Sequence, residues 1–322
     1  MGLIEKPKTY VEKDLETIFF RPMFVGENAE QLGIRVMYNM PMPTTIQMWS
    51  PNSDVLKRYS AGWNGGDNAT RVQKRIDMSK LKAEVGFSAS DYFQSVYELI
   101  AGRADVNLDD LTGTELEQAE TELFRASIAE SLRVMMWIGS TRGQSYNMMD
   151  GFITRATNYS IANAAPHYDA TSTPITADNV VELLKGMWAA ARPELKALRG
   201  EGQLAYFVTT DICDAYEEYL DSHATDGAYI DLVSGRRELS YHGIKLIDMG
   251  VTQYITDENG SAPSYCLLTD RRNLVLAVNT SDYPGSEVRM WYNPDAMENR
   301  QRAIFMAGTE ILDEKLIVWA MF

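Results

Sequence analysis

The sequence predicts an α+β protein with a long extended excursion in its first third and a compact region in its second half. Three observations lead to this fold class. Residues 33–82 form two extended stretches around a glycine-rich tip, residues 114–138 carry one uninterrupted amphipathic helical pattern, and short helix and strand patterns follow one another from residue 173 onward. Helices and strands that occupy separate runs of a chain are typical of α+β proteins. At 322 residues, the chain is long enough for one elaborate unit or for two to three subdomains.

Charge and cysteine content exclude several classes of protein. The formal net charge of −15 argues against a protein that coats nucleic acid, because neutralising phosphates requires an excess of Lys and Arg. Cys213 and Cys266 are too few for a disulfide framework, and we interpret them as ordinary buried thiols. The charged N-terminal segment lacks a signal-peptide pattern, and no apolar run approaches the roughly 20 residues of a membrane helix. We therefore expect a soluble cytosolic product with no membrane partner.

The excursion at residues 33–82 is expected to be a protruding hairpin. Pro41 and Pro43 forbid a regular helix in its outgoing arm and indicate an edge or unpaired strand. The return arm, residues 71–88, alternates only loosely between apolar and charged side chains. Because a two-stranded hairpin alone is marginal in water, we expect this one to lie on another surface.

The hairpin also carries the charges and aromatic rings that suggest a contact surface. Its basic residues stand out in an acidic chain: Lys57, Arg58, Arg71, Lys74, Arg75, Lys80 and Lys82. They form either a solvated face or a basic arm that lies on an acidic neighbouring subunit, where charge would orient the contact. Trp49 and Trp63 have two interpretations as well: a local loop contact, or anchors in a partner's pocket. Our candidates for contact between subunits are Trp49, Trp63, Arg71, Lys74 and Arg75.

Helices are expected both before and after the hairpin. Three are expected in the first half of the chain, at residues 9–20, 88–100 and 114–138. The last begins with the capping box Thr114 and Glu117 and ends at Gly139. Its length of about 35 Å exceeds that of a typical globular helix, so we interpret it as a rigid spar.

A compact α+β region follows a polar, irregular boundary at residues 145–172. A helix capped by Thr176 or Asp178 is expected to be stopped or kinked by Pro193. A buried strand at 204–209 and a helix at 210–220 come next. The remaining strands are expected at residues 243–250, 264–270, 274–279 and 287–293, with two more before the last residue. Four tryptophans fit periodic core positions: Trp137, Trp188, Trp291 and Trp319.

No set of catalytic or ligand-binding residues emerges from the sequence. The three histidines, His167, His223 and His242, have no partner at a metal-ligand spacing, and we interpret His242 as a turn residue. No nucleophile elbow, phosphate loop or dinucleotide fingerprint is present. Asp211 and Asp214 flank Cys213 and would raise its pKa, which makes it a poor nucleophile. We therefore predict a protein that is not an enzyme, with no catalytic residues, no cofactor and no metal.

The order of these elements resembles the Hong Kong 97 phage-type fold of tailed-phage major capsid proteins. The most specific stretches are LLTDRRNLVLAVNT (267–280) and VRMWYNPDAMENRQRAIFMAG (288–308), a succession of strands joined by polar turns. The resemblance covers nearly the whole chain and implies five parts. They are an N-arm at 1–32, an E-loop at 33–82, a peripheral (P) domain at 83–172 with a spine helix at 114–139, an axial (A) domain at 173–275, and closing strands at 276–322 that return to the P domain.

This resemblance implies a structural role. Copies of the protein would form hexamers and pentamers that tile an icosahedral head around packaged double-stranded DNA, without sequence-specific binding of that DNA. The implied partners are the chain itself, a portal, decoration proteins and a scaffolding protein. Because the first extended strand begins near residue 33, we expect that scaffold to be a separate protein. The expected location is the virion, after assembly in the host cytoplasm.

Two alternatives remain open at the level of sequence. Encapsulins share this fold and form cellular compartments around protein cargo. An α+β enzyme that uses residues 33–82 as a lid would instead be a small oligomer with a pocket of converging polar groups. No residues matching the lysine–asparagine cross-link of some relatives are identified.

Overall fold

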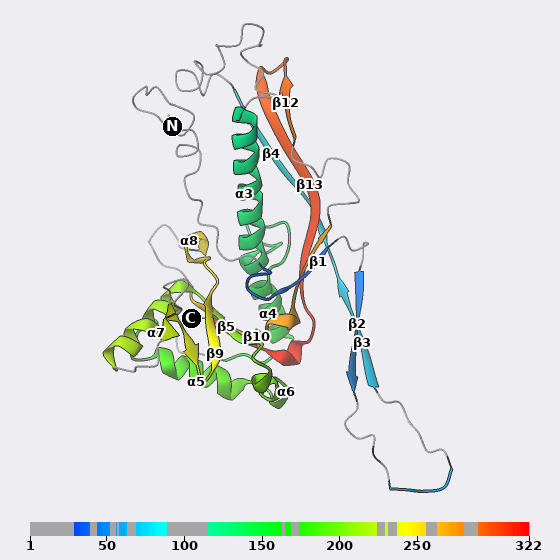
Figure 1. The fold of residues 1–322 in the computed structure, drawn as a ribbon, viewed down its shortest axis with the longest axis vertical. Coiled ribbons are helices and arrows are strands. Elements are labelled where there is room, and N and C mark those ends of the chain that lie inside the picture. The colour runs from blue at the N-terminus through cyan, green and yellow to red at the C-terminus, as the bar shows by residue number, and fades with distance from the viewer. Residues whose placement is uncertain are drawn as a thin grey trace.

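A long helix and two β-sheets form the framework of the computed structural model (Figure 1). The structure describes residues 29–38, 44–51, 56, 58–62, 69–88, 115–162, 165–168, 174–223, 229–230, 237–255, 263–279 and 289–321. The helices expected at 9–20 and 88–100 lie outside these residues, apart from Ser88. No helix in the described ranges is long and apolar enough to cross a membrane.

The first sheet, which we call the wall sheet, is built around the long strand β13. Its five strands are β1 (Arg35–Tyr38), β4 (Ser79–Phe87), β11 (Leu274–Asn279), β12 (Arg289–Asn293) and β13 (Glu298–Ile311). Strand β4 runs antiparallel along one edge of β13. Strands β12 and β11 pair with the first and second halves of β13, and β1 adds to β11 in parallel. The strand predicted at 274–279 is therefore confirmed, and so is the described part, 289–293, of the strand predicted at 287–293.

Helix α3 (Glu115–Ile138) covers one face of the wall sheet, as Figure 1 shows. The predicted spar is confirmed, although the proposed cap Thr114 lies outside the described residues. Gln301 of β13 donates from Nε2 to Oγ1 of Thr121, 3.1 Å away, and joins helix to sheet. The helix ends at Gly139, where a side chain would lie 2.5 Å from the carbonyl oxygens of Met135 and Met149. Glycine is therefore required there by close packing.

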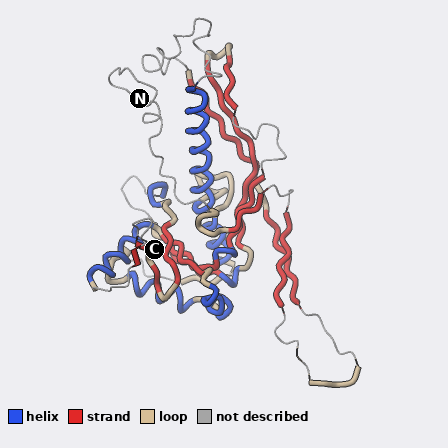
Figure 2. Tube along the Cα trace, viewed as in Figure 1, coloured by secondary structure: helices blue, strands red, loops and turns tan. Residues whose placement is uncertain are grey.

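The second sheet, the compact sheet, has the strand order β14-β10-β5-β9-β8. Its strands are β5 (Leu204–Val208), β8 (Ser240–Tyr241), β9 (Ile244–Asp248), β10 (Tyr265–Asp270) and β14 (Ile317–Met321). Helices α5 (Val180–Ala190), α6 (Pro193–Ala197) and α7 (Thr210–Ser222) pack on one face. The expected strands at 204–209, 243–250 and 264–270 and the helix at 210–220 are all present. Figure 2 shows that most helices gather around this sheet.

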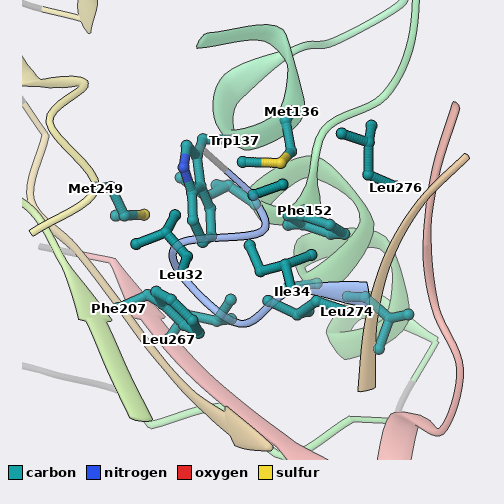
Figure 3. Packing of buried hydrophobic residues seen from close by; sticks show 14 of the residues in the cluster. Leu32, Ile34, Met136, Trp137, Phe152, Phe207, Met249, Leu267, Leu274 and Leu276 are labelled. Atoms are coloured by element: carbon teal, nitrogen blue, oxygen red, sulfur yellow. The ribbon is translucent and has the colours of Figure 1, made fainter. Parts of the chain in front are cut away.

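Both faces of the compact sheet are buried along β5, β10 and β14, and strand alternation explains how, whereas β8 and β9 have exposed residues. In β5, Tyr206 faces the core under α5 and α7, whereas Phe207 faces the core shared with α3. That shared core, the hub, joins the two sheets at the C-terminal end of α3. Figure 3 shows Trp137 and Phe152 packed with Leu32, Phe207, Leu267 and Leu274 in it. The rings of Trp137 and Phe152 meet edge to face, with centroids 5.5 Å apart.

Two features of the hub differ from the prediction. The segment expected to be irregular contains helix α4 (Phe152–Ile161), which buries Phe152, Ile153 and Ala156. Its other side chains are mostly polar, so the apolar pattern is too sparse to indicate a helix without its neighbours. The closing strands were expected to return together from residue 276, but β14 pairs with β10 in the compact sheet. The two closing strands therefore lie in different sheets, β13 in the wall sheet and β14 in the compact sheet.

Two smaller expectations also need correction. Neither Thr176 nor Asp178 caps α5, because the residue at its N-terminal boundary is Asn179, whose Oδ1 accepts from the backbone N–H of Thr176 at 2.8 Å. The predicted stop at Pro193 is confirmed, since α5 ends at Ala190 and that proline begins α6. Trp291 was expected in the core but is 40% exposed, because it lies on the wall-sheet face opposite α3, beneath Arg302.

Candidate functional site

The protruding hairpin consists of β2 (Thr44–Pro51) and β3 (Ala69–Ile76). It extends beyond the wall sheet as a separate two-stranded ribbon (Figure 1). The predicted antiparallel pairing of the two arms is confirmed. However, the ends of the predicted E-loop belong to the body, because β1 and β4 pair within the wall sheet.

Strand alternation gives the hairpin two different faces. Residues directly opposite each other in the register share a face, and every second residue along a strand returns to it. One face is exposed and mainly polar, and we call it the contact face. Its members are Thr45, Gln47, Trp49, Arg71, Gln73 and Arg75. The other, inner face carries Ile46, Met48, Val72, Lys74 and Ile76 and turns toward the body at its root.

The contact face combines an indole with two guanidinium groups. Trp49 is 62% exposed, and the guanidinium carbon of Arg71 lies 4.8 Å from the centroid of its ring. Such a cation–π pair at an exposed site contributes about 0.5–1 kcal/mol and holds both side chains in a common orientation. Arg75 pairs with Asp77 at 2.7 Å, and both side chains are exposed. Trp and Arg are the residue types most enriched at the centres of protein interfaces.

Lys74 differs from the other candidates because it is engaged within its own chain. It forms an ion pair with Glu314 and lies 4.0 Å from Oε1 of Glu310 and 4.4 Å from the ring centroid of Tyr159. Burial disfavours its ammonium ion, but the hydrogen bond to Glu314 and the groups of Tyr159 and Glu310 outweigh it and raise the pKa of Lys74. Strand alternation therefore places Lys74 on the face opposite the outward-facing arginines.

The remaining hairpin candidates have different outcomes. Trp63 and Lys57 lie outside the described residues. Near the tip, the described side chains are exposed, with Leu56 at 93% and Tyr59 at 95%. Lys82 lies on β4 of the wall sheet, where it pairs with Glu84 at 2.8 Å. The structure thus assembles Trp49, Arg71 and Arg75 on one surface and separates Lys74 and Lys82 from it.

A second set of charged residues, the spar clamp, was not identified from the sequence. Glu130 and Arg133 of α3 are buried and form two hydrogen bonds of 2.8 and 2.7 Å. Arg133 also donates to the carbonyl oxygens of Met249 and Gly250, and Tyr254 of α8 (Thr252–Ile255) donates to Glu130 at 2.6 Å. The spar clamp therefore fastens α3 to the segment after β9. The sequence does contain one indication of the spar clamp, because Glu130 and Arg133 lie three residues apart beside the apolar row of the helix.

The groups considered for chemistry occupy structural positions. The pKa of the Cys213 thiol is raised, chiefly by burial and also by nearby carboxylates, among them Asp248, Asp214 and Asp211. His242 has a φ of 52° and Gly243 a φ of 78° in the tight turn between β8 and β9, which confirms the turn interpretation. Within the described part of the chain, no group of three or more His, Cys, Asp or Glu side chains could hold a metal ion.

Comparison by sequence finds no relatives. No protein-family model matches the chain, and no curated protein sequence matches it either.

Comparison by structure finds chains from particle shells. A chain in the procapsid of satellite phage P4, solved with its size determination protein, matches with a TM-score of 0.55 and 10% identity over 97% of this chain and 91% of that one. A chain in the capsid of an empty GTA particle matches with a TM-score of 0.54 and 13% identity over 93% and 97%. The holo-SrpI encapsulin complex of Synechococcus elongatus contains one with a TM-score of 0.52 and 11% identity over 97% and 95%. At such identities the likeness concerns the fold, and this chain has the Hong Kong 97 phage-type capsid fold.

Proposed function

We propose that this protein is the major capsid protein of a tailed double-stranded DNA phage, a structural subunit rather than an enzyme. The observation that carries this proposal is a hairpin that leaves the body and presents Trp49, Arg71 and Arg75 on a face its own chain leaves exposed. The shared fold of phage and GTA capsid chains supports it. Arms that cannot be stable alone gain stability when a neighbouring copy covers them, so folding of the arm and assembly of the shell are coupled.

The proposed assembly, location and partners rest on the same likeness of fold. Copies of the chain would associate into hexamers and pentamers of an icosahedral head in the virion, after assembly in the host cytoplasm. A scaffolding protein, a portal and decoration proteins would be the further partners. Trp49, Arg71 and Arg75 would contact a neighbouring subunit, with acidic groups of that neighbour opposite the arginines.

The test reverses both arginine charges, in Arg71→Glu combined with Arg75→Glu. We expect the double variant to fold with a thermal midpoint lowered by no more than about 4 °C but to form few or no closed particles, because its contact face would repel an acidic neighbour. Negative-stain microscopy and sedimentation measure the particle yield, and calorimetry of the unassembled subunit measures folding.

The matched control is Lys185→Glu combined with Arg142→Glu, which changes the net charge equally at two exposed sites outside the hairpin. This control should assemble normally. Normal particle yield from the arginine double variant would refute the role of the contact face, and the absence of shells from the unaltered protein, alone or with a scaffold, would refute the capsid function.

An encapsulin-type compartment is the second candidate, because the encapsulin chain matches over nearly its full length. The two functions differ in what the particle encloses. Purified native particles treated with nuclease should retain protected DNA if the protein is a phage capsid. Particles that contain a protein cargo and no protected DNA would establish the compartment function instead.

A further inference from the structure

The root of the hairpin is held by a cluster of charged and aromatic residues from four separate elements. We call it the root cluster, and its members are Lys74 of β3, Arg155 and Tyr159 of α4, Glu310 of β13 and Glu314 of η4 (Glu314–Leu316). The cluster therefore joins the hairpin to the wall sheet, to a hub helix and to the segment that leads into the compact sheet.

Glu310 is the centre of this cluster. Its side chain is only 5% exposed, and it accepts hydrogen bonds from Nη1 of Arg155 at 2.8 Å and from the hydroxyl of Tyr159 at 2.5 Å. The backbone N–H of Ile311 donates to the same carboxylate at 3.0 Å. A buried carboxylate is stable only when paired and hydrogen-bonded, so α4 and β13 hold a preformed anionic site beside the hairpin.

Lys74 occupies the open side of that site. Its ammonium group is 4.0 Å from Glu310, forms an ion pair with Glu314 and lies over the ring of Tyr159. The side chain is 18% exposed, so these interactions are less screened by water than those of a surface pair. Next to it, Ile76 packs in the apolar cluster with Val275 and Met306. Apolar packing holds the hairpin on the body, and Lys74 adds a contact that depends on charge and direction.

Alternation then links this contact to the surface on the other side of the ribbon. In a strand, neighbouring side chains point to opposite faces. When Lys74 points inward, Arg71, Gln73 and Arg75 and the opposite residue Trp49 must point outward. A change in the twist or angle of the hairpin at its root would redirect the whole contact face.

We propose that Lys74 is a positioning residue whose ion pairs with Glu314 and Glu310 set the angle of the hairpin and thereby aim its contact face. What the contact face is for rests on the proposed function. The orientation itself is a property of a single subunit, so it can be tested without assembly.

The test measures the hairpin's angle in the unassembled subunit by double electron–electron resonance. Spin labels are placed at Gln47→Cys on the hairpin and Lys185→Cys on α5, both exposed, in a background with Cys213→Ser; Cys266 is buried. With Lys74→Met, which keeps the apolar stem and removes the charge, we expect the width of the distance distribution to increase by about twofold or more. Arg75→Met, the matched control on the opposite face, should leave the width unchanged.

A second variant protects the test against misfolding. Glu314→Gln removes the charge of the partner and should broaden the distribution as Lys74→Met does, while circular dichroism shows a folded subunit. A width equal to that of the Arg75→Met control in both variants would overturn the positioning role. Because no particles are needed, the failure of shell assembly in any variant would bear on the proposed function and not on this measurement.

Discussion

The central strands of the two sheets are buried in different ways. Strand β5 of the compact sheet is buried at each of its five residues, LAYFV. Strand β13 of the wall sheet alternates between buried and partly exposed residues over its first half and becomes fully buried from Met306 to Ile311. The first half of β13 has α3 on one face and solvent on the other, whereas the second half enters the hub. Stability is therefore concentrated around the hub and the compact sheet. The wall sheet along the first half of β13, like the hairpin, is stabilised by packing on one face only.

The largest effect is expected in the compact sheet. Phe207 is fully buried and its ring lies 5.0 Å from that of Trp137. Phe207→Ala should lower the free energy of unfolding by about 3–5 kcal/mol, because it removes apolar burial and leaves a cavity between two layers. Urea denaturation of the unassembled subunit measures the change. A loss below about 1 kcal/mol would contradict the concentration of stability at the hub.

The spar clamp is expected to come next. Arg133→Met leaves the carboxylate of Glu130 buried without its ion pair, which should cost about 3 kcal/mol. The double variant Arg133→Met with Glu130→Leu should recover much of that loss, since an apolar pair can replace a buried ion pair. The same denaturation experiment measures both. Equal destabilisation by the single and double variants would show that the carbonyl contacts of Arg133, not its pairing with Glu130, hold the clamp.

The spar clamp should also make stability depend on pH at both extremes. Burial opposes ionisation of Glu130, but hydrogen bonds from Arg133 and Tyr254 outweigh it and lower its pKa, so this contribution is lost as the pH falls below the ordinary glutamate range. Burial and the hydrogen bond to Glu130 raise the pKa of Tyr254 from its ordinary value of 10 to about 12. The contribution of Tyr254 to stability is therefore lost as the pH rises above 10.

Tyr254→Phe isolates the alkaline part of this dependence. Between pH 10 and pH 12 the unaltered protein should lose about 1 kcal/mol more than Tyr254→Phe does. Urea midpoints measured across this range provide the comparison. If the urea midpoints of the two proteins changed in parallel with pH, Tyr254 would make no contribution to the spar clamp.

The smallest effect is expected on the exposed face of the wall. Trp291 is 40% exposed and lies under the guanidinium group of Arg302, 5.7 Å from its ring centroid. Trp291→Ala should reduce the free energy of unfolding by about 1 kcal/mol or less, since only partial burial and one exposed cation–π contact are lost. A loss as large as that from Phe207→Ala would mean that the two regions do not differ as proposed.

Local patterns predicted the elements that carry strong signals of their own. Helix α3 has a long apolar row, β5 is a short continuous apolar run, and His242 and Gly243 form a two-residue turn, and each was found at its predicted place. Helix α4 had no such signal. Its buried residues are few, and its polar residue Arg155 has a partner 155 positions away in Glu310.

The candidate site shows the same limit. Composition was enough to indicate that the hairpin carries Trp49, Arg71, Lys74 and Arg75. It could not separate Lys74 from the arginines, because the face of each side chain depends on the register between β2 and β3 and on what the body places beneath them.

By itself, the sequence determined that the chain has an extended arm, a rigid spar and a compact α+β region, because periodicity, proline and turn residues act over a few positions. Only the tertiary structure decided that β14 joins the compact sheet, that Trp291 is exposed and that Lys74 turns inward. Each of these depends on residues distant along the chain, whose packing and charge outweigh local preference. For the same reason, only the tertiary structure distinguishes the contact face of the hairpin from the root cluster on its opposite side.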